Sequence, residues 1–272
     1  PIWQTGCKSS SGYRKGLHER NKESTRGPKM AVADVNKDGL DDIHLCGARG
    51  QGGTLMIQQR NGSFIPTDTA VFSKDARCED VDAVFFDANG DGYPDLYVVS
   101  GGNEVMSIPT SFHDRLYLND GKGHFTRSTN AFMPVAENKS CVAVADINND
   151  GRLDYFVGSL SNPTAYGLPL SSRLYVNNGK GYFAPMGNDK IPLNKIGMVT
   201  SATFADINHD GWQDLIVVGE WMPLKIFINH KGVFSETDVP ASTGLWQSVY
   251  ATDINGDGAI DILAGNWGHN SK

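Results

Sequence analysis

Several features that define other protein classes are missing from this chain of 272 residues. Its longest apolar runs, such as 83–86 and 215–218, are far too short to span a bilayer. Basic residues do not predominate, because 24 Lys and Arg stand against 31 Asp and Glu, for a formal net charge of −7. A nucleic-acid binder normally has a basic face. We therefore expect neither a transmembrane segment nor a nucleic-acid partner.

Cysteine is scarce, and its four copies form no recognisable motif. None of them belongs to a CxxC pair, so a zinc or thioredoxin-like site is not expected. Cys141 opens the apolar run CVAVAD and is predicted to be a small buried side chain. Cys46 and Cys78 could pair in an oxidising compartment, and the sequence leaves that pairing open.

Helical periodicity is absent as well, since no stretch of ten or more residues repeats its apolar positions every 3.6 residues. The chain also begins at Pro1 without an apolar leader, so we expect a mature or excised piece of a protein. What the sequence does contain is glycine, 31 residues in all, which predicts many tight turns.

A nine-residue pattern, D-x-N-x-D-G-x-x-D, occurs five times without gaps. We name the copies Asp loops 1 to 5, and they span 34–42, 87–95, 146–154, 206–214 and 253–261. An apolar run precedes and follows each loop. In the first four units an alternating pattern with an Asn-Gly type of turn comes next, as in LYLNDGKGHF. Each unit therefore predicts four short strands, A to D, with the Asp loop between A and B.

Repeated four-stranded antiparallel units predict an all-β fold, a β-propeller with five recognisable blades. Two stacked sandwiches are the alternative, but one sheet per unit favours the propeller. The blades are expected near 27–75, 76–134, 135–192, 193–241 and 242–272.

The fifth unit has only its first two strands. The N-terminal segment 1–26 could complete it, with 2–4 and 13–18 as candidate strands. Alternatively, the chain could be part of a six- to eight-bladed ring. We favour the five-bladed module.

The Asp loops predict calcium sites, because calcium is a hard cation that takes about 6–8 oxygen ligands. Loop positions 1, 3, 5 and 9 offer side-chain oxygens, and position 7 offers a backbone carbonyl. Position 6 is always Gly, which suits the positive φ of a tight loop. A polar turn without metal is the alternative, and five copies argue against it. An EF-hand does not fit, because position 12 is apolar instead of Glu and strands flank the loop.

The predicted ligands of about five Ca²⁺ ions, one in each blade, are Asp34, Asn36, Asp38, Leu40 and Asp42; Asp87, Asn89, Asp91, Tyr93 and Asp95; Asp146, Asn148, Asp150, Arg152 and Asp154; Asp206, Asn208, Asp210, Trp212 and Asp214; and Asp253, Asn255, Asp257, Ala259 and Asp261. Three Asp in each of five loops make up 15 of the 31 acidic residues, and five bound Ca²⁺ would change the net charge from −7 to +3, so we attribute the net acidity to metal ligation.

The loops and the strand pattern resemble the FG-GAP or VCBS repeats of integrin-α-like propellers, over roughly 27–272. A closer resemblance, to bacterial ASPIC/UnbV-type proteins, rests on GPKMAVADVNKDGLDDIHLCGA, EDVDAVFFDANGDGYPDLYVVSGGNE, DRLYLNDGKGHF, VVGEWMP and DINGDGAIDILAGNWGHNSK. It implies an extracellular, cell-surface or periplasmic protein, often of a bacterial envelope. Millimolar calcium outside cells, which fills sites of modest affinity, agrees with that location.

Function is expected at the end of the blades opposite the Asp loops. An antiparallel meander places the A–B and C–D turns at one end and the B–C and D–A connections at the other. The long segments 101–113 and 161–172 (B–C) and 67–80, 128–139 and 185–198 (D–A) share that second end. Variable loops on a rigid scaffold commonly carry binding sites.

The sequence thus predicts a non-catalytic module for recognition or adhesion that binds a protein or glycan ligand. Tyr166, Trp221 and Trp267 are the candidates to stack on a sugar ring, and packing of these aromatics between blades is the alternative.

Two other functions stay open. A calcium-stabilised polysaccharide lyase would need a base in a cleft. The chain has no HExxH or G-x-S-x-G motif, and it offers only the adjacent His113, Asp114 and Arg115, where Asp114 and Arg115 are expected to cap a strand, and the isolated Glu220. We therefore expect no enzyme. A structural spacer in a larger surface protein is the other possibility, and the sequence does not indicate an oligomeric state.

Overall fold

The structure is a computed structural model that describes residues 29–102 and 109–268. The predicted N-terminal segment 1–26, with its two candidate strands, lies outside the described residues. The first blade contains β1 (Met30–Ala33), β2 (Asp42–Leu45), β3 (Thr54–Gln58) and β4 (Phe64–Thr67). The second contains β5 (Asp80–Phe86), β6 (Asp95–Ser100), β7 (Arg115–Asn119) and β8 (Phe125–Arg127).

The later units repeat this plan. The third blade contains β9 (Lys139–Ala145), β10 (Asp154–Ser159), β13 (Arg173–Asn177) and β14 (Phe183–Pro185). The fourth contains β15 (Met198–Ala205), β16 (Asp214–Met222), β17 (Lys225–Asn229) and β18 (Phe234–Asp238). The fifth unit contributes β19 (Gly244–Thr252) and β20 (Asp261–Asn266).

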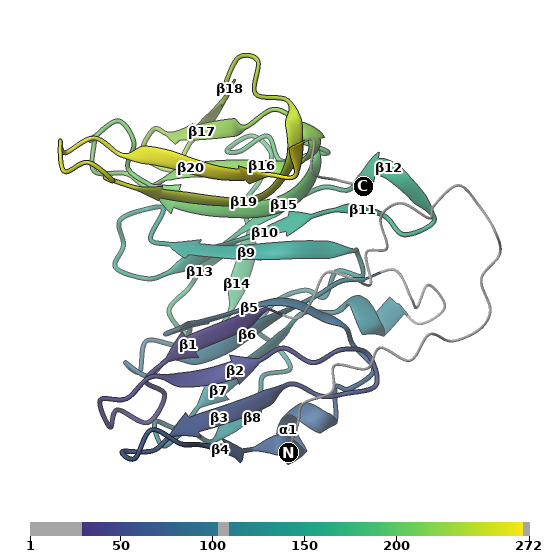
Figure 1. The fold of residues 1–272 in the computed structure, drawn as a ribbon, viewed down its shortest axis with the longest axis vertical. Coiled ribbons are helices and arrows are strands. Elements are labelled where there is room, and N and C mark those ends of the chain that lie inside the picture. Colours follow the sequence, from purple (N-terminus) through teal and green to yellow (C-terminus); the bar gives the residue numbers. More distant parts are fainter. Residues whose placement is uncertain (1–28, 103–108, 269–272) are drawn as a thin grey trace.

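Strands that follow one another within a blade pair antiparallel, and each of the first four units forms a sheet in the order A-B-C-D. Figure 1 shows the sheets as successive layers from the purple β1 to the yellow β20. The fifth unit joins the fourth sheet, because β19 pairs with the end of β16 at Leu245–Glu220 and Gly244–Met222. The predicted all-β propeller of four-stranded antiparallel blades is confirmed.

Three of the long connecting segments contain regular structure that the sequence did not predict. The B–C connection 161–172 folds into a small hairpin of β11 (Ser161–Asn162) and β12 (Ala165–Pro169). The D–A connection 67–80 contains the short helix α1 (Thr69–Ser73), and η2 (Pro109–Phe112) lies in the second B–C connection. Each of these elements has five residues or fewer, which is too short to show a periodic pattern in the sequence.

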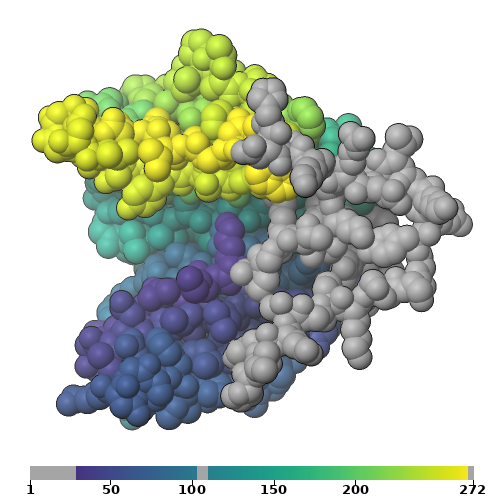
Figure 2. All heavy atoms as spheres, in the orientation of Figure 1, coloured from purple at the N-terminus to yellow at the C-terminus, as the bar shows by residue number. Residues whose placement is uncertain are grey.

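The apolar core is divided among the interfaces between consecutive units. The central strands β6 and β10 are buried along their whole length, since neighbouring blades cover both of their faces. Buried side chains from both partners fill each interface: Leu55 and Tyr117, Tyr97 and Tyr155, Phe156 and Phe227, and Ile216 and Val249. In the space-filling view the surface is hollowed between the purple first unit and the yellow fifth unit (Figure 2).

The cysteines that the structure describes are buried and form no disulfide. Cys46, Cys78 and Cys141 are all free and buried, so the Cys46–Cys78 pair is not formed and Cys141 is the small buried side chain that was predicted. Within 29–102 and 109–268, every helix lacks the length and apolar character needed to cross a membrane.

Candidate functional site

The Asp loops are held in shape by hydrogen bonds from their own backbone. In loop 1 the Gly39 N–H donates to Asp34 Oδ2 (2.8 Å), Asp38 N–H to Asn36 Oδ1 (3.0 Å) and Leu40 N–H to Asp38 Oδ1 (2.9 Å). The three bonds recur at the same positions in the other four loops. The glycine at position 6 has a φ between 82° and 89° in every loop, as predicted for a chain that turns tightly around a small centre.

The aspartate at position 9 has a different environment from those at positions 1 and 5. In the first four loops it is fully buried, and each of its oxygens accepts a backbone N–H. For Asp154 the donors are Ile147 at loop position 2 (3.2 Å) and Asn177 at the end of strand C (2.8 Å). In loop 5, Asp261 is partly exposed and accepts the Ile254 N–H at 3.1 Å. Position 9 therefore fastens the Asp loop to strand C of its own blade.

Burial makes the position-9 carboxyl groups weaker acids than usual. It raises the pKa of Asp95 and of Asp154 to about 6, and the neighbouring carboxylates at positions 1 and 5 push in the same direction. The pKa of Asp42 and Asp214 is raised for the same reasons. A cation bound among the three carboxylates would offset both effects.

In the exposed loop 5 the pKa values of two aspartates are lowered instead of raised. Backbone N–H donors, Gly258 first, lower the pKa of Asp253, and the Ala259 N–H lowers the pKa of Asp257. These two carboxylates are thus held in the charged form that binds a metal.

The donor set fits calcium, because carboxylate, amide and carbonyl oxygens are the ligands that this ion prefers. In the described ranges, no group of three or more His, Cys, Asp or Glu side chains stands together in a way that could hold a metal ion. The position-9 carboxylate is turned toward backbone donors, although each of its oxygens keeps a second lone pair. The five calcium sites and their ligands therefore stay a prediction.

Sequence reasoning missed one recurring residue near the loops. An asparagine ends strand C in the second, third and fourth units: Asn119, Asn177 and Asn229. Its backbone N–H donates to the position-9 aspartate, and its side chain donates to the carbonyl of loop position 8, at 3.0–3.1 Å. The recurring LYLN, LYVN and IFIN carry this signal, since each ends in asparagine at the last position of strand C.

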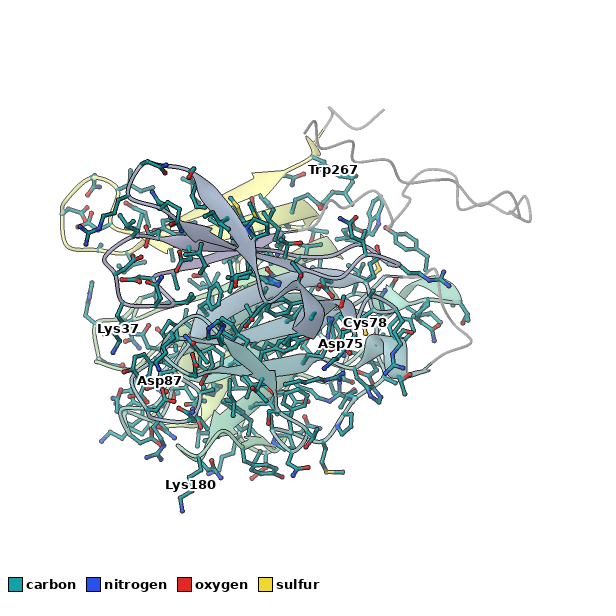
Figure 3. The ribbon with its side chains drawn as sticks, turned by 90° about the horizontal axis from the view of Figure 1, so that it is seen from below. Lys37, Asp75, Cys78, Asp87, Lys180 and Trp267 are labelled. Carbon is teal, nitrogen blue, oxygen red and sulfur yellow. The ribbon has the colours of Figure 1, made fainter. Side chains whose placement is uncertain are left out.

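Neighbouring Asp loops touch one another at this end of the blades. The Lys37 ammonium of loop 1 lies 4.2 Å from the centre of the Tyr93 ring of loop 2, and Asn149 of loop 3 donates to the Gly211 carbonyl of loop 4 at 3.1 Å. Figure 3 shows Lys37, Asp87 and Lys180 toward one side of the molecule and Trp267 on the other. Loop 1 thus contacts loop 2 and loop 3 contacts loop 4, on the side of the molecule away from Trp267.

The three candidate aromatics come from three adjoining units, and one of them contacts Glu220. Tyr166, from β12, donates its hydroxyl to Glu220 Oε2 at 2.5 Å, and Gln247 donates to Oε1 at 3.4 Å. Trp221 follows Glu220 directly on β16. Trp267 is tied to the strand beside Glu220, because its N–H donates to the carbonyl of Leu245, the partner of Glu220. Units three, four and five therefore each place one candidate aromatic at this end of the blades.

The two tryptophans do not pack between blades. Trp221 is 65% exposed and Trp267 42% exposed, whereas Tyr166 is half-buried and Glu220 is 2% exposed. Trp221 also has a φ of 58°, a left-handed conformation that bulky residues rarely adopt. It sits at a bulge where β16 leaves its regular register with β19. The fold thus directs this ring outward at a local cost.

The other candidate acids and bases are engaged in structural contacts. Asp114 accepts the Ser100 N–H and the Tyr97 hydroxyl, both at 2.9 Å, and lies 3.2 Å from the Lys139 ammonium. Arg115 is buried in an ion pair with Asp80 at 2.6 Å. Burial lowers the pKa of His113. Asp114 and Arg115 organise the start of strand C, as the sequence predicted.

Comparison with known families identifies the repeat. The model of the FG-GAP-like repeat matches residues 34–98, 87–157, 165–217 and 206–264, and these ranges include all five Asp loops. The matches cover most of the chain, which therefore belongs to the FG-GAP-like repeat family. A comparison with curated proteins gives no match.

Solved structures show a similar fold at low sequence identity. A lectin from Agrocybe aegerita that recognises non-reducing terminal N-acetylglucosamine has a TM-score of 0.56 and 18% identity, over 88% of this chain and 60% of the lectin chain. This chain thus spans about 60% of the lectin's length. A candidate exo-β-1,3-galactanase from Bifidobacterium bifidum gives 0.48 and 10%, over 89% and 83%, which is only a loose likeness.

Proposed function

We propose that this chain is a non-catalytic, calcium-stabilised propeller that binds carbohydrate at the face opposite its Asp loops. The observation that carries the proposal is that three consecutive units each place one aromatic, Tyr166, Trp221 or Trp267, at the same end of the blades, with both tryptophans exposed. Scaffold and recognition are then separate, with the metal at one end of the blades and the ligand at the other.

The chemistry of these side chains suits a sugar. The exposed faces of Trp221 and Trp267 can stack on the apolar side of a pyranose ring, while the buried carboxylate of Glu220 accepts the Tyr166 hydroxyl and holds that half-buried ring in place. Strained backbone such as that of Trp221 is concentrated at functional sites, where the surrounding structure maintains it. The likeness to a lectin fold supports carbohydrate as the first ligand class to test, before a protein ligand.

The location and the metal belong to the same proposal. Loops that use three carboxylates each, in a repeat resembling exported ASPIC/UnbV-type proteins, suit an extracellular, cell-surface or periplasmic protein. Calcium there is abundant enough to fill sites of modest affinity. Its chemical contribution would be to neutralise the carboxylates of each loop and hold the turn between strands A and B.

Screening the protein on a glycan array in calcium buffer tests the ligand. Trp221→Ala should abolish the binding of any hit without changing the melting temperature, because the ring lies in solvent. Tyr250→Ala is the matched control, since Tyr250 is 63% exposed but lies away from Glu220 on β19. A blank array with folded protein, or equal binding by the Trp221 variant, would count against the carbohydrate site. Unsaturated products from uronic-acid polysaccharides would show a lyase instead.

A further inference from the structure

We infer that two asparagines couple the Asp loops in pairs, loop 1 with loop 2 and loop 3 with loop 4, so that metal in one loop favours metal in its partner. The inference rests on the calcium sites of the proposed function. It assigns Asn119 and Asn229 as positioning residues that join the position-9 carboxylates of neighbouring blades.

The first connection runs from blade one to blade two. Asp42 Oδ2 accepts the N–H of Val35, and the carbonyl of Val35 accepts Asn119 Nδ2 at 2.8 Å. The same amide group donates to Pro94 O at 3.0 Å, and the Asn119 N–H donates to Asp95 Oδ1 at 2.8 Å. One side chain from blade two thus contacts both Asp loops.

The second connection repeats this arrangement between blades three and four. Ile147 donates its N–H to Asp154 Oδ2 and accepts Asn229 Nδ2 at 2.8 Å through its carbonyl. Asn229 Nδ2 also donates to Gln213 O at 3.1 Å, and its N–H donates to Asp214 Oδ1 at 2.7 Å. Asn119 and Asn229 are about one hundred residues apart in the sequence, so the repeated arrangement reflects the geometry that the blades share.

The interface between blades two and three lacks this bridge in the described structure. Asn177 bonds its own loop, through the Leu153 carbonyl (3.1 Å) and Asp154 (2.8 Å). The carbonyl of Ala88, which corresponds to Val35 and Ile147, instead accepts the backbone N–H of Gly181 at 3.1 Å. Asn177 is therefore a natural control that keeps the local role and omits the bridging one.

Burial makes the bridges sensitive to loop geometry. Asn119 is 4% exposed and Asn229 is fully buried, so water cannot replace the acceptors of their amide groups. If one of these bonds breaks, a buried donor is left without a partner. A metal that fixes Asp154 also restrains the Ile147 backbone, because Asp154 accepts the N–H of Ile147 and Asn229 donates to its carbonyl. That in turn orients the backbone donor to Asp214. Because linkage is reciprocal, loop 4 must influence loop 3 to the same extent.

Terbium, a luminescent substitute for calcium, can test the pair formed by loops 3 and 4 on the full chain. Trp212 lies within loop 4 and is the one tryptophan in any Asp loop, so terbium emission excited through it reports loop 4. Trp212→Phe should remove that emission. Weakening loop 3 by Asp146→Asn should lower the terbium affinity of loop 4 by about fivefold or more.

Replacement of Asn229 should remove this effect of Asp146→Asn. Asn229→Asp deletes the two side-chain donor bonds but keeps the acceptor for Gly232, and Asn229→Ser is the second variant if the first does not fold. In either background, Asp146→Asn should leave the loop 4 affinity unchanged. Asn177→Asp should preserve the fivefold effect, and Asp253→Asn in loop 5 should not reproduce it.

The outcomes separate the inference from the proposed function. If no loop of the wild-type protein binds terbium or calcium, the metal part of the proposed function fails, and the coupling fails with it. If loop 4 binds terbium but ignores Asp146→Asn, or responds equally with and without Asn229, only the coupling is overturned. A purely structural asparagine would lower the melting temperature while leaving the effect of Asp146→Asn in place.

Discussion

Replacement of Asp154 by Asn separates the structural role of position 9 from its predicted role as a metal ligand. Asp154 accepts one backbone N–H on each carboxylate oxygen, from Ile147 and from Asn177. An asparagine can accept only one of them, because its other terminal group is itself a donor. The variant therefore leaves one buried backbone donor without a partner.

The expected loss of folding stability in Asp154→Asn follows from that lost hydrogen bond. A buried donor left unsatisfied costs about 1–3 kcal/mol, and the lower half of the range is expected because a neutral amide is less costly to bury than a carboxylate. Calcium at 100 times its dissociation constant would stabilise the wild type by about 2.7 kcal/mol per site. If Asp154 is a ligand, the variant loses most of that contribution as well.

Urea unfolding in chelator and in excess calcium measures the two parts. The matched control is Asp261→Asn, where the carboxylate is partly exposed and accepts one backbone N–H, so its cost in chelator should stay within about 0.5 kcal/mol. No loss of stability for Asp154→Asn in chelator would refute the structural role. An equal loss with and without calcium would refute ligation by Asp154.

Two further predictions concern buried charge. In chelator, stability should fall as the pH rises from about 4 to 6, because the pKa of Asp95 and Asp154 is about 6 in the folded protein against an ordinary 3.8, so the protonated forms favour folding below that range. Melting curves in this range should flatten in the Asp95→Asn, Asp154→Asn double variant, and a wild-type curve that rises with pH would oppose the prediction. Asp80→Asn should cost about 3–5 kcal/mol in urea unfolding, because it leaves the buried Arg115 without its partner. Asp238→Asn, which removes the exposed partner of Lys225, should cost at most about 1 kcal/mol, and similar losses for the two variants would contradict the assignment.

The blade architecture was predictable because its signals are local and repeated. Each Asp loop lies between two apolar runs, and each Asn-Gly type of turn lies between alternating residues, so four strands per unit follow from short windows of sequence. The loop conformation was predictable for the same reason: Gly39 and its equivalents have the positive φ that the pattern required.

The remaining features depend on contacts between distant residues. Tyr117 and Arg127 both donate to Asp75, although they are 42 and 52 residues away from it in the sequence. No local sequence pattern reveals these contacts. The pairing of β19 with β16 likewise joins separate units. For the candidate site, the residue types were visible in the sequence, but the contact between Tyr166 and Glu220, 54 residues apart, was not.

Equilibrium dialysis of chelator-treated protein against calcium tests the central claim most directly. The five loops share one geometry and one set of oxygen donors, and the prediction is binding that approaches five equivalents per chain, one for each Asp loop. Bound calcium below one equivalent, in protein that remains folded, would contradict the claim that the Asp loops are metal sites.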